Sequence, residues 1–138
     1  MLKLAIIAAV AMLAAPQVHQ AHKKNEARDM MVELGAGKQG KALDDAIAAA
    51  AAYPLGSRQN PVRENQPAGQ HAYLKRLRCA DGAAPAFERA GNVGEGPFGF
   101  IVDDYKVTCP GKAPVDIFID MYHDGPETRP VPGFTLAG

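Results

Sequence analysis

An uncharged apolar run near the start of the chain decides how much of the sequence is left to fold. The run LAIIAAVAMLAA occupies residues 4–15 directly after Lys3, and its length matches the apolar core of a secretory signal. A helix that spans a membrane needs about 20 such residues, so the run is too short to be an anchor. We therefore expect residues 1–21 to be a signal peptide and the protein to be periplasmic or secreted.

The cleavage site is less sharply defined than the apolar run. Cleavage is expected after Ala21, although this places His19 where signal peptidases prefer a small residue. Cleavage after Ala15 is disfavoured by Pro16. Two other interpretations of the run stay open: a buried helix of a cytosolic fold and an uncleaved membrane tether.

Residues 22–138, which would form the mature protein, are enough for one domain with a core of modest size. The whole chain has 15 basic and 15 acidic side chains, so its formal net charge is +0. A balanced charge favours neither nucleic acid nor an anionic membrane as a partner. We expect no nucleic-acid partner and no stable membrane span.

The chain contains two cysteines, Cys79 and Cys109, so an oxidising compartment allows one intramolecular disulfide. Closing a loop of this length stabilises a folded domain by about 3 to 4 kcal/mol through the entropy of the unfolded chain. A catalytic pair is the weaker interpretation, because redox-active cysteines have the CxxC spacing. We expect a structural disulfide.

Two short amphipathic helices are expected in residues 22–52. Within residues 25–34 apolar side chains recur at i, i+3, i+4 and i+7, with Asn25 as the N-cap and Gly35 as the stop. A second helix is expected over residues 41–52. Their apolar faces contain mostly alanine and methionine, which bury little area per turn, so we expect the helices to rest on a sheet.

Residues 53–138 contain three stretches in which apolar and polar side chains alternate as in a half-buried strand. These stretches are residues 71–79, 99–109 and 115–122. Helix stays an alternative for the first, because Leu74 and Leu77 also lie three residues apart. The short CPGKAP link between the other two favours an antiparallel hairpin. The expected fold is α+β: one or two N-terminal helices on a small antiparallel sheet of three to four strands, with one disulfide, in a single domain.

Two segments of this half carry no regular pattern. The glycine-rich stretch GNVGEGPFG, residues 91–99, indicates a flexible loop, because no strand is expected before it and it lacks the GK[ST] of a phosphate-binding loop. The proline-rich residues 123–138 are expected to be an extended tail that packs through Val131 and Phe134.

Four segments carry a resemblance to other proteins: YPLGSRQNPVR, AYLKRLRCADG, DDYKVTC and DIFIDMYHDGPETRPVPGF. Together they resemble a group of small exported bacterial proteins of uncharacterised function, over residues 53–134. The resemblance implies a secreted Gram-negative protein whose functional domain is this half of the chain. It implies no activity, cofactor or catalytic residue.

One local concentration of positive charge lies in the same half. The candidate binding residues are Arg58, Arg63, Tyr73 and Arg76. A turn held by prolines that presents arginines favours paired guanidinium contacts with an anionic group, so we expect the partner to be a protein or an anionic envelope ligand. A solvated strand face is the simpler interpretation.

A second candidate site consists of Asp104, Asp120 and His123, on or just after two of the expected strands. Carboxylates and imidazole bind divalent metals and exchange protons. These residues lack a recognised ligand spacing, so a polar sheet face with a loop histidine is the simpler interpretation.

No complete catalytic set can be assembled from the sequence. The one serine, Ser57, has no GxSxG context. The leading hypothesis is a binding or interaction protein that is not an enzyme and needs no cofactor. The alternative is a metal-assisted hydrolase of cell-envelope substrates.

If the apolar run is a cleaved signal, protein recovered from the periplasm of a Gram-negative host is expected to begin near His22 and to contain no free thiol. Intact mass analysis without reductant measures both properties. An intact Met1 would support the tether interpretation, and two free thiols would contradict the disulfide.

Overall fold

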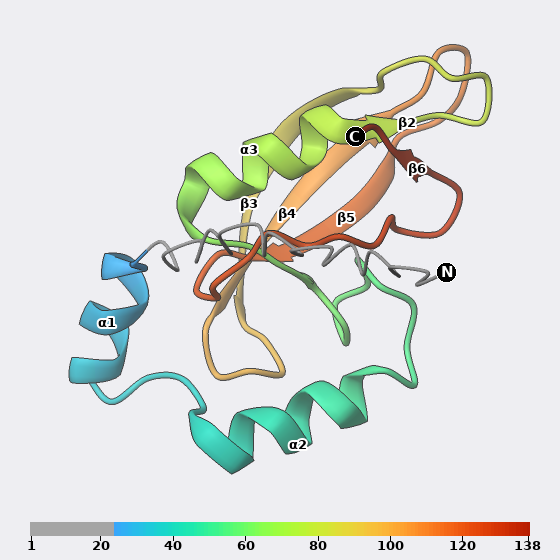
Figure 1. Cartoon of the computed structure of the whole chain (residues 1–138). Helices are drawn as coiled ribbons and strands as arrows, with labels where there is room; N and C mark the ends of the chain where they lie inside the picture. Colours follow the sequence, from blue (N-terminus) through green and yellow to red (C-terminus); the bar gives the residue numbers. More distant parts are fainter. Residues whose placement is uncertain (1–23) are drawn as a thin grey trace, which may run out of the picture.

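Three helices and two sheets make up residues 24–138, the part of the chain that the computed structural model describes (Figure 1). In chain order the elements are α1 (Glu26–Glu33), α2 (Gly40–Ala50), β1 (Val62–Arg63), α3 (Gln66–Arg76), β2 (Leu77–Arg78), β3 (Ala86–Glu95), β4 (Ile101–Thr108), β5 (Val115–Asp120) and β6 (Thr135–Leu136). The α+β class predicted from the sequence is confirmed. The expected signal peptide, residues 1–21, lies outside the described residues.

The larger sheet has the strand order β1–β5–β4–β3, and β2 pairs with β6 in the smaller one. β1 runs parallel to β5, whereas the β5–β4 and β4–β3 pairs are antiparallel, so the larger sheet is mixed rather than purely antiparallel. Within residues 24–138, no helix is long and apolar enough to cross a membrane.

Helix α1 begins where the sequence predicts, because Asn25 caps it. The Asn25 side-chain oxygen accepts the N–H of Arg28 at 2.9 Å, and its Nδ2 donates to the carbonyls of Met121 and His123 at 2.8 and 3.0 Å. Asn25 is fully buried. One side chain therefore starts the helix and also fastens it to the segment after β5.

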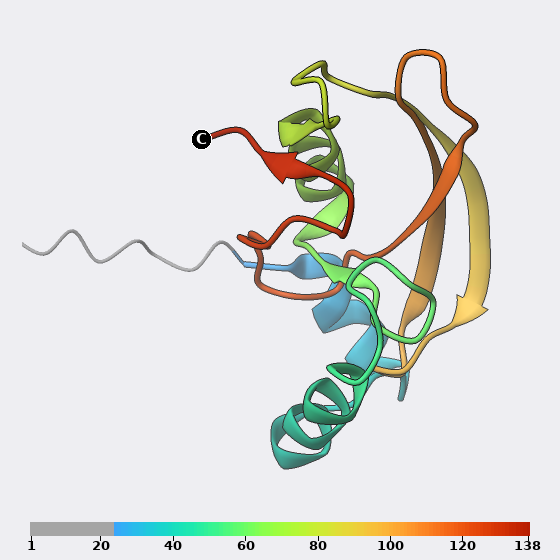
Figure 2. The same cartoon turned by 90° about the vertical axis from the view of Figure 1, so that its right-hand side faces the viewer.

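Helices α1 and α2 pack at one end of the sheet, whereas α3 lies against its face (Figure 2). The apolar side chains of α1 and α2 surround three aromatic rings, Phe98, Phe100 and Tyr122. Phe98 and Phe100 come from the turn between β3 and β4, where their rings are almost completely buried. The small apolar faces of α1 and α2 are thus stabilised by packing against these three aromatic rings.

Residues 71–79, predicted as a strand, are instead the second half of α3 followed by β2. The buried side chains have the helical spacing i, i+3, i+4 and i+7: Gln70, Tyr73, Leu74 and Leu77. The strand prediction is wrong because the first of these four buried residues, Gln70, is polar, so the apolar residues alone do not show the full helical spacing. Gln70 is buried because its Nε2 donates to Asp103 at 3.0 Å and its Oε1 accepts the Tyr105 hydroxyl at 2.9 Å.

Residues 91–99, predicted as a flexible loop, belong partly to β3, which pairs with β4 at the edge of the sheet. Register shifts after Arg89 and after Asn92 mark irregular pairing on this strand. The side chains of β3 are mostly exposed. The sequence of β3 therefore shows no alternation of apolar and polar residues. The strand is held by main-chain pairing with β4 and not by a buried side-chain face.

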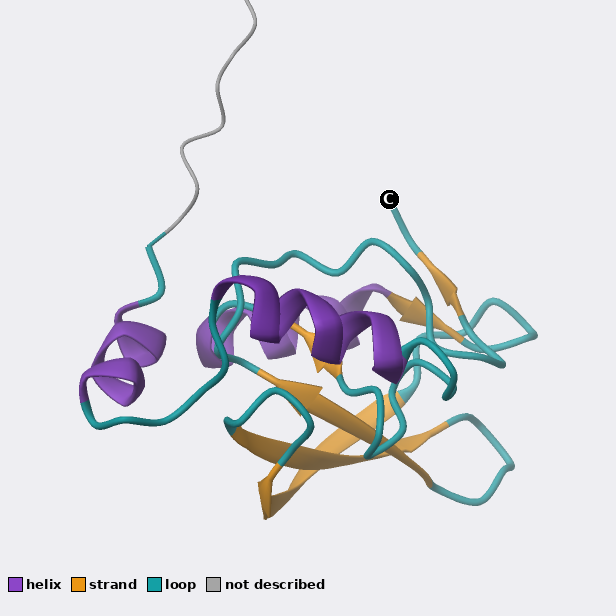
Figure 3. Cartoon of the chain, turned by 90° about the horizontal axis from the view of Figure 1, so that it is seen from below, coloured by secondary structure: helices purple, strands orange, loops and turns teal. Residues whose placement is uncertain are grey.

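The hairpin predicted over residues 99–122 is confirmed as β4 and β5. Its inner face and α3 form the main core, in which helix and sheet are stacked as two layers (Figure 3). The predicted disulfide is also confirmed: Cys79 follows β2, Cys109 follows β4, and their Cα atoms are 6.0 Å apart. The bridge therefore ties the end of the helical layer to the end of the hairpin.

Glu64, directly after β1, is a buried acid. Its Oε1 accepts the N–H of Glu127 at 2.8 Å, and the carboxyl is almost inaccessible to solvent. Burial raises the pKa of the Glu64 carboxyl above its ordinary value, and this effect outweighs the hydrogen bonds that lower the pKa.

Replacing both cysteines, as in C79A with C109A, is expected to lower the free energy of unfolding by about 3 to 4 kcal/mol. The reason is that the bridge closes a loop across a sequence separation of 30 residues in the unfolded chain. Denaturant titration of the variant against the oxidised protein measures the difference. A loss below about 1 kcal/mol would contradict this explanation.

The raised pKa of Glu64 predicts a pH dependence. The folded state holds this proton more tightly than the unfolded chain, so the stabilisation is complete below the ordinary carboxyl pKa and is lost as pH rises through the raised value. E64Q keeps the acceptor oxygen and cannot ionise. Between about pH 4 and about pH 8 we expect E64Q to lose less stability than the natural protein, measured by thermal unfolding; identical pH profiles would contradict the assignment.

Candidate functional site

The four residues of the predicted basic patch have different surroundings. Arg58 is exposed and donates from Nη2 to the Val93 carbonyl of β3 at 2.6 Å. Arg76 donates to main-chain carbonyls of the C-terminal segment. Tyr73 is 1% exposed and lies in the core. The four side chains therefore do not share one exposed turn, because α3 is a helix that directs Tyr73 inward. Arg63, on β1, is half-buried, and a binding role for it stays a prediction.

The second predicted set is brought together only in part. Nε2 of His123 lies 3.1 Å from Oδ2 of Asp120, and both side chains are buried. Asp104 instead pairs with Lys106, with 3.4 Å between Oδ2 and Nζ. Within residues 24–138, no group of three or more histidine, cysteine or acidic side chains is placed to hold a metal ion. The three residues thus do not form the metal site that the alternative hypothesis needs.

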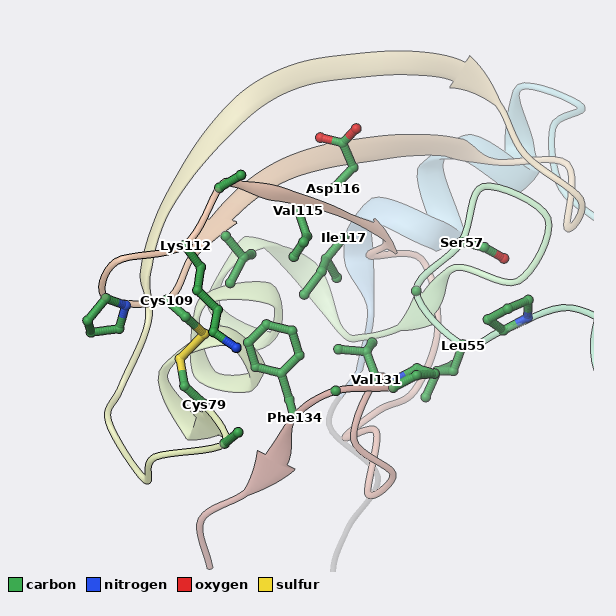
Figure 4. A pocket seen from close by; sticks show the side chains of 18 of the residues that line it. Leu55, Ser57, Cys79, Cys109, Lys112, Val115, Asp116, Ile117, Val131 and Phe134 are labelled. Atoms are coloured by element: carbon green, nitrogen blue, oxygen red, sulfur yellow. A yellow bond between two sulfur atoms is a disulfide. The ribbon is translucent and has the colours of Figure 1, made fainter.

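An apolar concave site lies beside β5 instead. It has a volume of about 510 Å³, and we call it the apolar groove. Val115 and Ile117 point into it from β5, Phe134 and Val131 face them, and the disulfide closes one end (Figure 4). A concave apolar site with a few polar groups at its edge is the usual form of a binding site.

The facing wall of the apolar groove depends on a close approach between two loops. Gly56 has a φ of +85°, and a Cβ on it would lie 2.5 Å from Cγ1 of Val131. Glycine is therefore required here both for the backbone conformation and for the contact. The Gly56 carbonyl accepts the N–H of Phe118 at 2.8 Å, which fixes this loop to the end of β5.

Within residues 24–138, the outer edge of β5 is only partly paired along the apolar groove. β1 pairs with β5 only at Ile119 and Asp120. Because the Phe118 N–H points outward to Gly56, the alternation of an antiparallel strand also directs the N–H and C=O of Asp116 to this outer edge. The Asp116 side chain points to the other side of the sheet, where it pairs with Lys106, so Asp116 lines the groove with its main chain (Figure 4).

One positive charge lies at the mouth of the apolar groove. Lys112, in the turn between β4 and β5, extends toward the Phe134 ring (Figure 4). Within the described residues, 24–138, no carboxylate lies within 4 Å of its ammonium group. The groove therefore combines apolar walls, a main-chain donor and acceptor, and one cation.

Comparisons of the chain with protein-family models, curated proteins and solved structures find no match. The resemblance to small exported bacterial proteins therefore stays a prediction, and the functional argument rests on geometry.

Sequence reasoning found the walls of the apolar groove but not the groove itself. It predicted a half-buried strand over residues 115–122, and Val131 and Phe134 as the packing residues of the tail. The unpaired edge has no signal in the sequence, because every strand residue carries the same main-chain groups. The proline at position 114, directly before β5, is a hint of an edge strand.

Proposed function

We propose that this chain is a small exported binding protein, periplasmic or secreted, whose apolar groove takes an extended peptide segment of a partner protein. The observation that supports this proposal is the outward-facing main chain of Asp116 beside the apolar walls at Val115 and Ile117. An exposed sheet edge with an adjoining apolar groove is the arrangement by which proteins add a peptide strand.

An extended peptide suits the apolar groove better than a purely apolar ligand does. A peptide main chain pairs with the N–H and C=O of Asp116, each hydrogen bond contributing about 1 kcal/mol. Alternate side chains of the added strand then lie on the same side as Val115 and Ile117 and enter the groove. A lipid acyl chain fills the same volume but leaves the main-chain groups unpaired, so the favoured ligand is a peptide with apolar side chains at every second position.

The chemistry of the lining favours binding over catalysis. Both cysteine sulfurs are oxidised in the disulfide, so neither is a nucleophile. The residues among 24–138 that line the groove include no histidine. The proposed location rests on the disulfide, which persists in oxidising compartments, and on the apolar run at residues 4–15.

The proposal is tested by selecting peptides from a random phage-displayed library on the purified, oxidised protein. We expect enriched peptides with apolar residues at alternate positions, whose labelled forms are then titrated by fluorescence anisotropy. D116P removes the edge N–H and is expected to weaken binding by about tenfold or more. D116A loses the same carboxylate but keeps the N–H, so this matched control is expected to bind like the natural protein.

A second pair of variants tests the wall of the apolar groove. V115K introduces a charge on β5 at a residue that is 46% exposed, and I101K introduces the same charge on β4 at a residue that is 39% exposed and outside the groove. Only V115K is expected to lose peptide binding. A library without enriched peptides, or equal effects of D116P and D116A, would refute strand addition.

A further inference from the structure

A second concave site, which shares no residue with the apolar groove, lies between α1, α2 and the segment after β5. We call it the polar cleft, and its volume is about 490 Å³. Its charged and polar lining consists of Arg28, Arg63, His123, Asp124, Glu127 and Arg129. Two side chains of α2, Leu43 and Ile47, add an apolar part.

Two of the three arginines are neutralised by neighbours. Nη1 of Arg28 lies 2.6 Å from Oδ1 of Asp124. Arg129 binds Glu127 through two hydrogen bonds, of 2.9 Å from Nε and 3.0 Å from Nη2. The contact between Arg129 and Glu127 lowers the pKa of the Glu127 carboxyl below its ordinary value despite the opposing effect of burial, which is the largest single influence. Both carboxylates that line the cleft therefore form ion pairs with these two arginines.

Arg63 is the cation that remains. Its side chain is half-buried, and within residues 24–138 no carboxylate lies within 4 Å of its guanidinium. The group lies 5.4 Å from the centre of the buried Phe98 ring, and its Nη1 donates to Asn60 at 3.4 Å, a long hydrogen bond. Burial lowers the pKa of Arg63, the direction expected where the loss of water is incompletely compensated. A guanidinium has five N–H donors, so most of them lack a protein partner among the described residues.

His123 is a buried polar side chain of the same cleft. Its side chain is 8% exposed, and Phe98 and Phe100 contact its ring edge to face, with centroids 5.2 and 5.9 Å away. Its Nε2 lies 3.1 Å from Oδ2 of the fully buried Asp120, so this carboxylate and the imidazole form a pair at the base of the cleft.

We infer that the polar cleft binds the carboxylate of a small molecule with an apolar body, and that Arg63 is the residue that holds it. The three arginines of the lining face two lining carboxylates and the buried Asp120 beside His123, so the cleft has little positive charge to spare and suits a singly charged carboxylate better than a phosphate dianion. A guanidinium that lies near an aromatic ring and keeps free N–H groups suits bidentate binding of a carboxylate. Leu43 and Ile47 are placed to contact the apolar body.

The test uses hexanoate as the probe, with hexanamide and hexyl phosphate as comparison compounds, in calorimetric titrations of the purified protein. We expect hexanoate to bind the natural protein, hexanamide not to bind, and hexyl phosphate to bind at least about tenfold more weakly than hexanoate. R63A is expected to weaken hexanoate binding by at least about tenfold. R58A, which removes the same charge at an exposed site in the loop before β1, is the matched control and is expected to leave hexanoate binding unchanged.

A third variant separates this inference from the apolar groove. K112A removes the cation of that groove and is expected to leave hexanoate binding unchanged; loss of binding in K112A but not in R63A would overturn the assignment. If R63A does not fold, R63M tests the same charge, and the Arg63 side-chain N–H signals of the natural protein are expected to shift in NMR titration with hexanoate. Unmoved Arg63 signals, or equal or tighter binding of hexyl phosphate, would also refute the carboxylate site.

Discussion

The hydroxyl of Tyr73 is the contact on which both concave sites depend. It donates to the Arg129 carbonyl at 2.9 Å and accepts the Val131 N–H at 3.0 Å. These two bonds hold the C-terminal segment on α3 although its residues form no regular structure there. Arg129 then pairs with Glu127 in the polar cleft, while Val131 enters the apolar groove. Burial raises the pKa of the Tyr73 phenol well above its ordinary range, so the hydroxyl stays protonated as a donor.

The position of α3 depends in turn on a buried polar network. Gln70 joins the helix to Asp103 and to the Tyr105 hydroxyl, and Arg89 of β3 binds the other oxygen of Asp103 at 2.8 Å. Burying such groups without partners would cost about 1 to 3 kcal/mol each, so the network is favourable only in one arrangement of helix and sheet. It therefore specifies where α3 lies, while the apolar core supplies most of the stabilisation.

The apolar groove and the polar cleft, which differ in chemistry, are both built on this arrangement of α3 and the C-terminal segment. Among residues 24–138, the apolar groove has a partly paired strand edge and one lysine at its mouth, whereas the polar cleft has an arginine, Arg63, with no carboxylate within 4 Å. Residues 126–134 contribute to both, from Pro126 in the cleft to Phe134 in the groove. The two proposed binding sites therefore lie at separate surfaces and share this segment as a wall.

The sequence by itself determined the features that arise from local pattern. Asn25 starts α1 because its side chain caps the next turn, and the alternation of Val115, Ile117 and Ile119 makes β5 a strand. With two cysteines in the chain, the pairing of Cys79 and Cys109 had no competitor. Each of these predictions depends on neighbours in the chain or on simple counting.

Tertiary structure alone decided the rest. Residues 66–76 form a helix whose stripe begins at Gln70, and a polar side chain occupies a core position only where Asp103 and Tyr105 meet it. β3 forms because its main chain pairs with that of β4. Main-chain groups are the same in every sequence, so this pairing leaves no pattern in the residues. Neither the outward-facing edge at Asp116 nor the lack, among residues 24–138, of a carboxylate within 4 Å of Arg63 could be predicted from the order of residues, because pairing and desolvation are properties of distance in space.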